Sequence, residues 1–370
     1  MSEWKKVKFL DFIVLQRGFD LTKDSIKDGP YPVVCSTSIM GYHNNYKVEG
    51  PGVVTGRSGT LGETQYVKGN FWPHNTTLFV KDFKGNNRQF VYYFLKNFDI
   101  ASMGGGAAIP SLNRNVLSNL SVTIPDLSIQ NNIANILSRY DSLIENYQKQ
   151  IKLLEEAAQR LYKEWFVDLH FPGHENTKID DGVPEGWEKK SVSQLGDYLN
   201  GFAFKPSDWQ ETGKPIIKIK EMGNGVSDET PRNNGERVPV KYLVKAGDLL
   251  FSWSATLMVI VWTGEEGWLN QHLFKVTPAK GIGREFLLQS ISNAIAEFSN
   301  LTTGSTMKHI QRNKLDQVFV NTPSSIVMEK YNKVAESIRA QILNISSQIR
   351  LLTEARDRLL PKLMSGEIAV

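Results

Sequence analysis

Glycine runs, histidines and a single cysteine are the residues of this 370-residue chain whose types could support catalysis. The runs Gly56-Arg-Ser-Gly-Thr-Leu-Gly and Gly104-Gly-Gly are glycine-rich, but neither sits in a strand–loop–helix phosphate cradle. His170 and His174 have a spacing that suits a metal, yet they flank Phe-Pro-Gly in a loop with no third ligand evident. Cys35 has no histidine close in sequence and is interpreted as a small apolar filler. We expect no metal site.

Two classes of enzyme that act on DNA also lack their motifs here. An adenine methyltransferase needs an Asn/Asp-Pro-Pro-aromatic tetrapeptide, which the sequence does not contain. A common Mg-dependent nuclease needs Pro-Asp followed by Glu-x-Lys, whereas Pro125-Asp126 leads into a long helical stretch. The sequence therefore favours a non-catalytic protein that recognises a ligand and leaves chemistry to its partners.

Polar and aromatic side chains that could contact DNA gather in predicted loops. Arg bonds bidentately to guanine and Asn or Gln to adenine, while Lys and Ser commonly bind phosphate. In the first half of the chain the candidates are Tyr42, His43, Arg57, Ser58, His74, Asn75 and Arg114. In the second half they are Ser252, Ser254, Asn270, Gln271, His272, Thr306, Lys308 and His309.

An apolar stripe with an average spacing of about 3.5 residues predicts a long helix over residues 128–166. No Gly or Pro interrupts this stretch, and Ser128 is expected to cap its start. At about 1.5 Å per residue the helix would be roughly 58 Å long, so its stripe needs a partner. The seam residues are Ile133, Tyr140, Tyr147, Leu154 and Leu161.

The partner lies in the same chain, because the stripe returns 198 residues later. The second set of seam residues is Ile338, Ile345, Leu352 and Leu359. Arg356 breaks the apolar run, and Pro361 is expected to end or kink the helix. Two helices that each follow a large segment most simply pack antiparallel, which would place the two segments at opposite ends of a rod.

The segments that precede the helices also repeat. The offset between the copies is 183 for Trp4 and Gly18, 196 for Val53 and Ser58, and 198 for Arg114. The growing offset predicts an insertion in one loop of the second copy. We therefore expect a mixed α/β chain with an internal pseudo-two-fold repeat: two similar globular domains joined by two long antiparallel coiled-coil helices. The expected bounds are 1–124 and 168–322 for the domains and 125–167 and 323–370 for the helices.

Charge and composition narrow the class of ligand. Residues 1–124 carry 14 Lys and Arg against 9 Asp and Glu, while residues 125–185 carry 6 against 11. A polyanion would favour the basic domain over the acidic helix. One cysteine suits a reducing cytoplasm, where we expect the protein to act. No apolar run is long enough to span a membrane.

Four stretches resemble the specificity subunits of type I restriction-modification enzymes, and the resemblance covers essentially the whole chain. They are Ala355-Arg-Asp-Arg-Leu-Leu-Pro-Lys-Leu-Met-Ser-Gly-Glu-Ile368, Gly304-Ser-Thr-Met-Lys-His-Ile310, Gly267-Trp-Leu-Asn-Gln-His-Leu-Phe274 and Val183-Pro-Glu-Gly-Trp187. The resemblance implies two target recognition domains, each reading one half of an asymmetric bipartite site in double-stranded DNA. It further implies two DNA-methyltransferase (modification) subunits docked on the helices, and restriction subunits. S-adenosylmethionine, ATP and Mg would be bound only by those partners, and no cofactor by this chain.

Two alternatives have different consequences. A coiled-coil scaffold whose domains bind protein ligands would bind them indifferently to salt and to DNA competitor. A DNA reader would weaken steeply as salt rises. A stand-alone enzyme, which the missing motifs disfavour, would turn over a methyl donor without partners.

Overall fold

The computed structural model describes residues 4–58, 60–100, 117, 120–300 and 314–370, which form two compact units. Unit 1 comprises Met1–Glu145 and Leu351–Val370, and unit 2 comprises Asn146–Arg350. Each unit thus contains one globular segment and a part of each of the two long helices.

The globular part of unit 1 is built on two small sheets and a strand pair. A four-stranded antiparallel sheet has the order β2-β8-β5-β6, and a three-stranded sheet has the order β4-β3-β7, with β3 and β7 parallel. The separate pair β1–β9 is antiparallel. The elements are β1 (Lys5–Lys8), α1 (Phe9–Phe12), β2 (Val14–Arg17), η1 (Lys23–Ser25), β3 (Tyr31–Val34), β4 (Ile39–His43), β5 (Gly52–Gly56), β6 (Thr64–Val67), β7 (Trp72–Pro73), β8 (Thr77–Asp82), α2 (Arg88–Asn97) and β9 (Ser121–Ile124).

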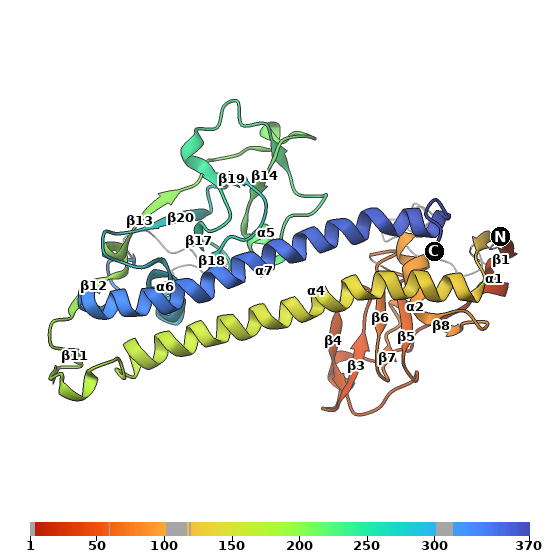
Figure 1. Cartoon of the computed structure of the whole chain (residues 1–370), viewed down its shortest axis with the longest axis horizontal. Coiled ribbons are helices and arrows are strands. Elements are labelled where there is room, and N and C mark those ends of the chain that lie inside the picture. The colour runs from red at the N-terminus through yellow and green to blue at the C-terminus, as the bar shows by residue number, and fades with distance from the viewer. Residues whose placement is uncertain (1–3, 59, 101–116, 118–119, 301–313) are drawn as a thin grey trace. The chain divides into compact units, whose positions relative to one another are not determined.

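Helix α2 covers the four-stranded sheet of unit 1 (Figure 1). It begins after Asn87, whose Oδ1 accepts a hydrogen bond from the amide of Phe90 at 3.0 Å, a typical N-cap contact. Phe90, Val91 and Leu95 on its inner face are fully buried. These apolar residues fall on one face of the segment, which is why it forms a helix that packs on the sheet.

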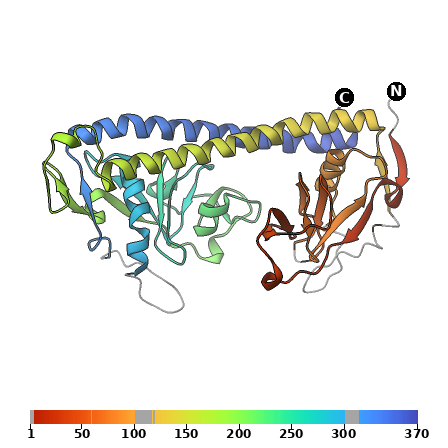
Figure 2. The ribbon, with the colours of Figure 1, turned by 90° about the horizontal axis from the view of Figure 1, so that it is seen from below.

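The globular part of unit 2 repeats this plan. One four-stranded antiparallel sheet has the order β13-β20-β17-β18, and a second sheet has the order β15-β14-β19-β16. Helix α6 covers the first sheet, beside which it lies in Figure 2. The elements are β10 (Ile179–Asp180), β11 (Val183–Pro184), β12 (Glu188–Ser191), η5 (Val192–Leu195), β13 (Gly196–Asn200), η6 (Pro206–Asp208), β14 (Lys214–Ile217), α5 (Ile219–Asn224), β15 (Arg232–Asn233), η7 (Val240–Tyr242), β16 (Leu243–Val244), β17 (Leu249–Ser252), β18 (Met258–Val261), β19 (Gly267–Leu269), β20 (Leu273–Pro278), α6 (Arg284–Asn300) and β21 (Phe319–Thr322).

The two globular parts share strand order and strand direction. β3 and β14 each have a parallel neighbour, β7 and β19, and an antiparallel one, β4 and β15. The pairs β1–β9 and β12–β21 also correspond. This common topology confirms the internal repeat that the sequence predicts.

Part of the insertion predicted in the second copy lies between β14 and β15, and the rest lies between β15 and β16. The matching strands β3 and β4 are joined by residues 35–38, whereas residues 218–231 join β14 to β15 and include α5. The pairing of Tyr31 with His43 corresponds to that of Lys214 with Asn233, so the offset has risen from 183 to 190 at β15. It is 196 from β16 on, because the bridge between Val48 and Phe71 corresponds to the pairing of Val244 with Gly267.

The first long helix, α4 (Leu127–Tyr162), continues into a single π-helical turn, η3 (Lys163–Val167), which is followed by the short turn η4 (His174–Asn176). Its capping residue is Asp126, whose Oδ1 accepts from the amide of Ile129 at 3.0 Å, so the expectation of a Ser128 cap is wrong. The second long helix, α7 (Ser325–Ser365), continues past Pro361, which therefore does not end it.

The two long helices are antiparallel. In unit 1 the first half of α4 shares a core with the last turns of α7, through Ile133 and Leu137 on one helix and Leu363 on the other. In unit 2 the end of α4 and η3 share a core with the first turns of α7, which includes Tyr162 and Tyr331. The start of each helix thus packs with the end of the other.

Candidate nucleic-acid interface

In unit 1, four of the residues singled out in the sequence come together at one edge of the domain. Arg57 and Ser58 follow β5, and their amides both donate to the carbonyl of Thr76, at 2.9 and 3.1 Å. The guanidinium of Arg57 also donates to the carbonyl of Asn75 at 3.4 Å. Residues 56–58 and 74–76 thus form one surface, which we call edge 1, and it includes His74 from the β7–β8 turn.

Edge 1 is extended by two residues that sequence reasoning missed. The side-chain amide of Asn75 donates to the carboxylate of Asp20, which also accepts from Arg17 at 2.9 Å. The hydrogen bond from Asn75, followed by that from Arg17, lowers the pKa of Asp20, so its carboxylate stays charged at neutral pH. Arg17 and Asp20 flank Gly18-Phe19, the pair that repeats in the second copy. That repeat is the feature of the sequence that could have indicated them.

Tyr42 and His43 end β4 and differ sharply in exposure. The Tyr42 side chain is 54% exposed and is free to contact a ligand. His43 is buried, its Nδ1 accepts from the amide of Lys27 at 3.0 Å, and its ring lies edge-on to Trp72 at 5.3 Å. Because its bonded nitrogen and its ring are already used inside the domain, His43 supports the fold rather than offering a contact surface.

In unit 2, the candidates from β17 and the β19–β20 turn also form one edge, residues 252–254 and 270–272, which we call edge 2. Ser252 donates to the carbonyl of Ser254 at 3.1 Å, and Asn270 accepts from the amide of His272. The side chains at 252, 254 and 270 are all buried, and those of Ser252 and Asn270 bond the backbone of their own turns. Gln271 and His272 are half-buried and remain accessible.

His272 retains hydrogen-bonding capacity at edge 2. Its Nε2 lies 3.3 Å from the side-chain amide nitrogen of Gln271, whereas its buried Nδ1 bonds none of the residues that the structure describes. The ring of Trp253 lies 5.8 Å from the His272 ring. The accessible part of the imidazole is therefore the side that carries Nε2, next to Gln271.

The two edges occupy matched places in the repeat. Parallel bridges join Phe19 to His74 and Phe202 to Asn270. A Gly-Phe pair therefore contacts the turn in each copy, Gly18-Phe19 in the first and Gly201-Phe202 in the second. A Cβ at Gly18 would lie 2.1 Å from the carbonyl oxygen of His74, and one at the matching Gly201 would lie 2.1 Å from that of Asn270. Glycine is required at both steps because the backbones approach too closely for any side chain.

The side chains differ where the backbones agree. With an offset of 196, Trp253 occupies the place of Arg57, Asn270 that of His74, and Gln271 that of Asn75. Arg114, Thr306, Lys308 and His309 lie outside the described residues.

The seam residues of the long helices are buried or half-buried throughout. Ile133 and Ile345 are buried. The half-buried seam residues are Tyr140, Tyr147, Leu154, Leu161, Ile338, Leu352 and Leu359. Arg356, which interrupts the apolar stripe, bonds the carboxylate of Asp141 at 2.6 Å, and that carboxylate also accepts from the hydroxyl of Tyr93 on α2.

Within the described ranges, no three His, Cys, Asp or Glu side chains are placed to hold a metal ion. Burial raises the pKa of the Cys35 thiol, which disfavours the reactive thiolate. No helix in the described part of the chain is both long and apolar enough to cross a membrane.

Comparison with known proteins gives consistent matches. The family described as type I restriction modification DNA specificity domain matches residues 1–156 and 184–330. The type I restriction enzyme MjaIX specificity subunit of Methanocaldococcus jannaschii is 26% identical over 308 residues, which cover 76% of this chain and 69% of that protein. The HindI specificity subunit of Haemophilus influenzae is 24% identical over 339 residues, which cover 73% of this chain and 74% of that protein.

Among solved structures, a crystal structure of a type I restriction-modification S subunit from M. genitalium superposes with a TM-score of 0.60 at 17% identity. The match covers 98% of this chain and 96% of that one. At this level of identity the likeness shows a common fold.

Proposed function

Because the chain belongs to the family of type I restriction-modification DNA specificity domains, we propose that it selects the DNA target of such an enzyme. Each recognition domain, 1–124 and 168–322, reads one half of an asymmetric bipartite site in double-stranded DNA. The chain itself is not catalytic. The observation that carries this proposal is the pair of matched edges, which share a backbone and differ in side chains.

The chemistry of the edges supports two different half-sites. Arg57 and Asn75 at edge 1 offer the groups that bond guanine and adenine, and Tyr42 adds an exposed ring in the same domain. Edge 2 offers the amide of Gln271 and the imidazole of His272 in their place. Two copies of one scaffold with unlike contact groups would read unlike sequences, and a helix pair of fixed length would set the spacing between them.

The outer faces of the helices support the docking of two copies of one partner. Leu153 on α4 is 64% exposed and Leu351, at the matched position of α7, is 54% exposed. Each sits in the same local sequence: Leu153, Glu156, Ala157 and Arg160 on α4, and Leu351, Glu354, Ala355 and Arg358 on α7. We call these the twin patches.

The twin patches also share their internal contacts. Glu156 pairs with Arg160 at 3.8 Å, and Glu354 pairs with Arg358 at 4.0 Å. A cleft of about 450 Å³ opens beside Leu153 on α4. An exposed leucine beside a fixed charge pair suits a protein interface, and its duplication suits two identical modification subunits. S-adenosylmethionine, ATP and Mg belong on these and the restriction subunits under this proposal.

Footprinting with the modification subunits present tests the reading of DNA. We expect two protected patches separated by a few unprotected base pairs, and a binding constant that falls steeply with salt. One continuous patch, or binding that is indifferent to salt and to competitor DNA, would count against the proposal.

Stoichiometry tests the docking. We expect two modification subunits for each wild-type chain, one for Leu153→Asp or Leu351→Asp, and none for the double variant. Leu143→Asp is the control, since Leu143 is 39% exposed on α4 but lies outside the twin patches. Two bound subunits in the double variant would refute these docking residues.

A further inference from the structure

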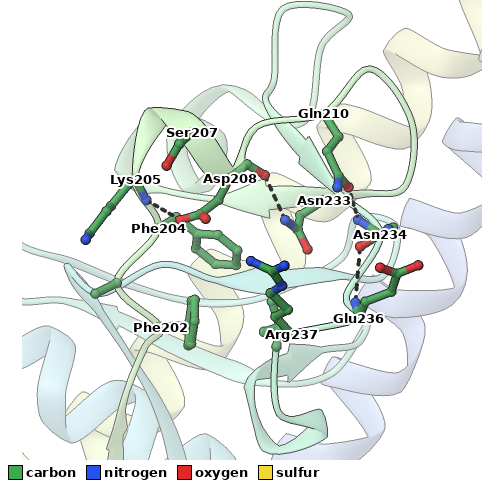
Figure 3. A pocket seen from close by; sticks show the side chains of 12 residues that line it. Phe202, Phe204, Lys205, Ser207, Asp208, Gln210, Asn233, Asn234, Glu236 and Arg237 are labelled. Atoms are coloured by element: carbon green, nitrogen blue, oxygen red, sulfur yellow. Dashed lines mark hydrogen bonds between the residues drawn. The ribbon is translucent and has the colours of Figure 1, made fainter.

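Unit 2 contains a cleft that the proposed function does not yet use. It has a volume of about 530 Å³ and lies between residues 202–210 and 233–238 (Figure 3). The rings of Phe202 and Phe204 lie 4.9 Å apart in its wall, and the guanidinium of Arg237 points to the Phe204 ring. The backbone of Phe202 also bridges to Asn270, so this wall of the cleft adjoins edge 2.

Several hydrogen-bond donors in this cleft have no partner among the described residues. The Gln210 side-chain oxygen accepts from the amide of Asn234 at 2.7 Å, and the Asn234 side-chain oxygen accepts from the amide of Glu236 at 3.1 Å. Backbone amides thus occupy these acceptors, and the two NH₂ groups bond no described residue. The exposed side chains of Lys205 and Arg237 likewise form no ion pair within the described residues.

Charge in the cleft is balanced, which affects the kind of ligand it suits. Asp208 and Glu236 line it together with the two cations. The Asp208 carboxylate accepts from the backbone amide of Lys205 at 2.7 Å and is therefore partly used as a cap. With little net charge, long-range attraction is weak, and recognition would rest on short-range donors and on the aromatic wall.

We propose that this cleft is a second DNA-contacting subsite of unit 2, which binds an acceptor-rich part of the duplex beside the bases read at edge 2. Two parts of DNA share this chemistry: the guanine edge that carries O6 and N7, and a backbone phosphate. The proposal rests on the proposed function and adds to it the residues Gln210, Asn234, Arg237 and Lys205.

The first copy of the repeat carries different groups at the matched places. With an offset of 183, Leu21 replaces Phe204, Thr22 replaces Lys205, and Lys27 replaces Gln210. The opposite wall, residues 233–238, lies where the offset changes between the copies. The subsite therefore belongs to unit 2 alone and would make its half-site unlike that of unit 1.

The test uses the full chain together with its modification subunits. Methylation-aware sequencing first defines the wild-type motif, and duplexes with the intact motif or a scrambled one are then the probes. Arg237→Ala and Lys205→Ala are compared with Lys280→Ala, an exposed lysine in the turn before α6. Melting temperature is measured for each variant, because surface alanines should leave it unchanged.

A base-reading subsite predicts that Arg237→Ala weakens binding to the motif about tenfold or more and relaxes the methylated motif in one half only. A phosphate subsite predicts weaker binding to both duplexes and a salt slope reduced by roughly 0.9 for each phosphate that is no longer neutralised. Either result supports the subsite. If both variants match wild type and Lys280→Ala in affinity, salt slope and motif, the subsite is refuted. A wild-type complex with no sequence preference would instead refute the proposed function.

Discussion

Removing the buried arginine of α7 should destabilise unit 2 more than any surface change. Arg339 donates from Nε and Nη2 to the two carboxylate oxygens of Glu285 on α6, at 2.7 and 3.1 Å. The Glu285 side chain is fully buried and that of Arg339 is 5% exposed. Arg339→Ala leaves the buried carboxylate with only the 4.0 Å contact to Arg284, and loss of a buried partner typically costs about 3–5 kcal/mol. For a unit of this size, roughly 2–4 °C per kcal/mol converts this to a melting point about 6–20 °C lower.

Thermal unfolding followed by circular dichroism and tryptophan fluorescence measures the effect. Trp165 and Trp187 belong to the core of unit 2 and report on it directly. The double variant Glu285→Leu/Arg339→Met should unfold near the wild-type temperature, because the buried carboxylate and guanidinium are both gone and Arg284, which also pairs with Glu285 at 4.0 Å, is 32% exposed to water. If Arg339→Ala alone melts within a degree of wild type, the ion pair does not hold α6 to α7 and this reasoning is wrong.

Two further predictions follow from burial. Leu154→Asp and Leu352→Asp, at half-buried seam positions, should each lower the free energy of unfolding by roughly 2–4 kcal/mol. Leu351→Asp, which lies one residue away and is exposed, should leave the unfolding midpoint in urea unchanged. Equal midpoints for all three variants would argue against a packed seam. Burial raises the pKa of Tyr162 to about 12, so the stability linked to this group is complete below pH ~10 and falls as pH rises through 12. The phenolate absorbance that Tyr162→Phe removes should therefore appear only together with loss of circular dichroism above pH ~10, and a Tyr162 phenolate in the folded chain would contradict this. Burial also raises the pKa of Tyr66, Tyr92, Tyr93, Tyr198 and Tyr331.

The long helices have matched sequences but unlike polar contacts with their domains. Asp141 of α4 and Arg339 of α7 occupy equivalent positions, 198 residues apart. In unit 1 the carboxylate of Asp141 meets Tyr93 and Arg356, and in unit 2 the guanidinium of Arg339 meets Glu285. The break that Arg356 makes in the apolar stripe is thus one member of a polar contact. Periodicity along the chain reveals such a residue but cannot reveal its partner.

Three details differ from the sequence predictions because local sequence signals do not show which contacts a residue makes: the cap of α4, the effect of Pro361 and the place of Ser252. Ser128 and Asp126 are both good capping residues, and only the backbone geometry shows that the Asp126 carboxylate meets the amide of Ile129. Pro361 has no donor to give to the helix, yet α7 continues to Ser365. Ser252 reads as a loop tip in the sequence but ends a buried strand, where its hydroxyl bonds the backbone.

The sequence by itself determined the long helices, their seam and the duplication, because these depend on spacing along the chain. The insertion was also visible, as a change of offset before Val53. Only the tertiary structure decided which loop tips meet, that His43 and Asn270 are buried, and that Phe202 and Arg237 face one cleft. Those facts depend on contacts between residues far apart in the chain, and no local pattern records them.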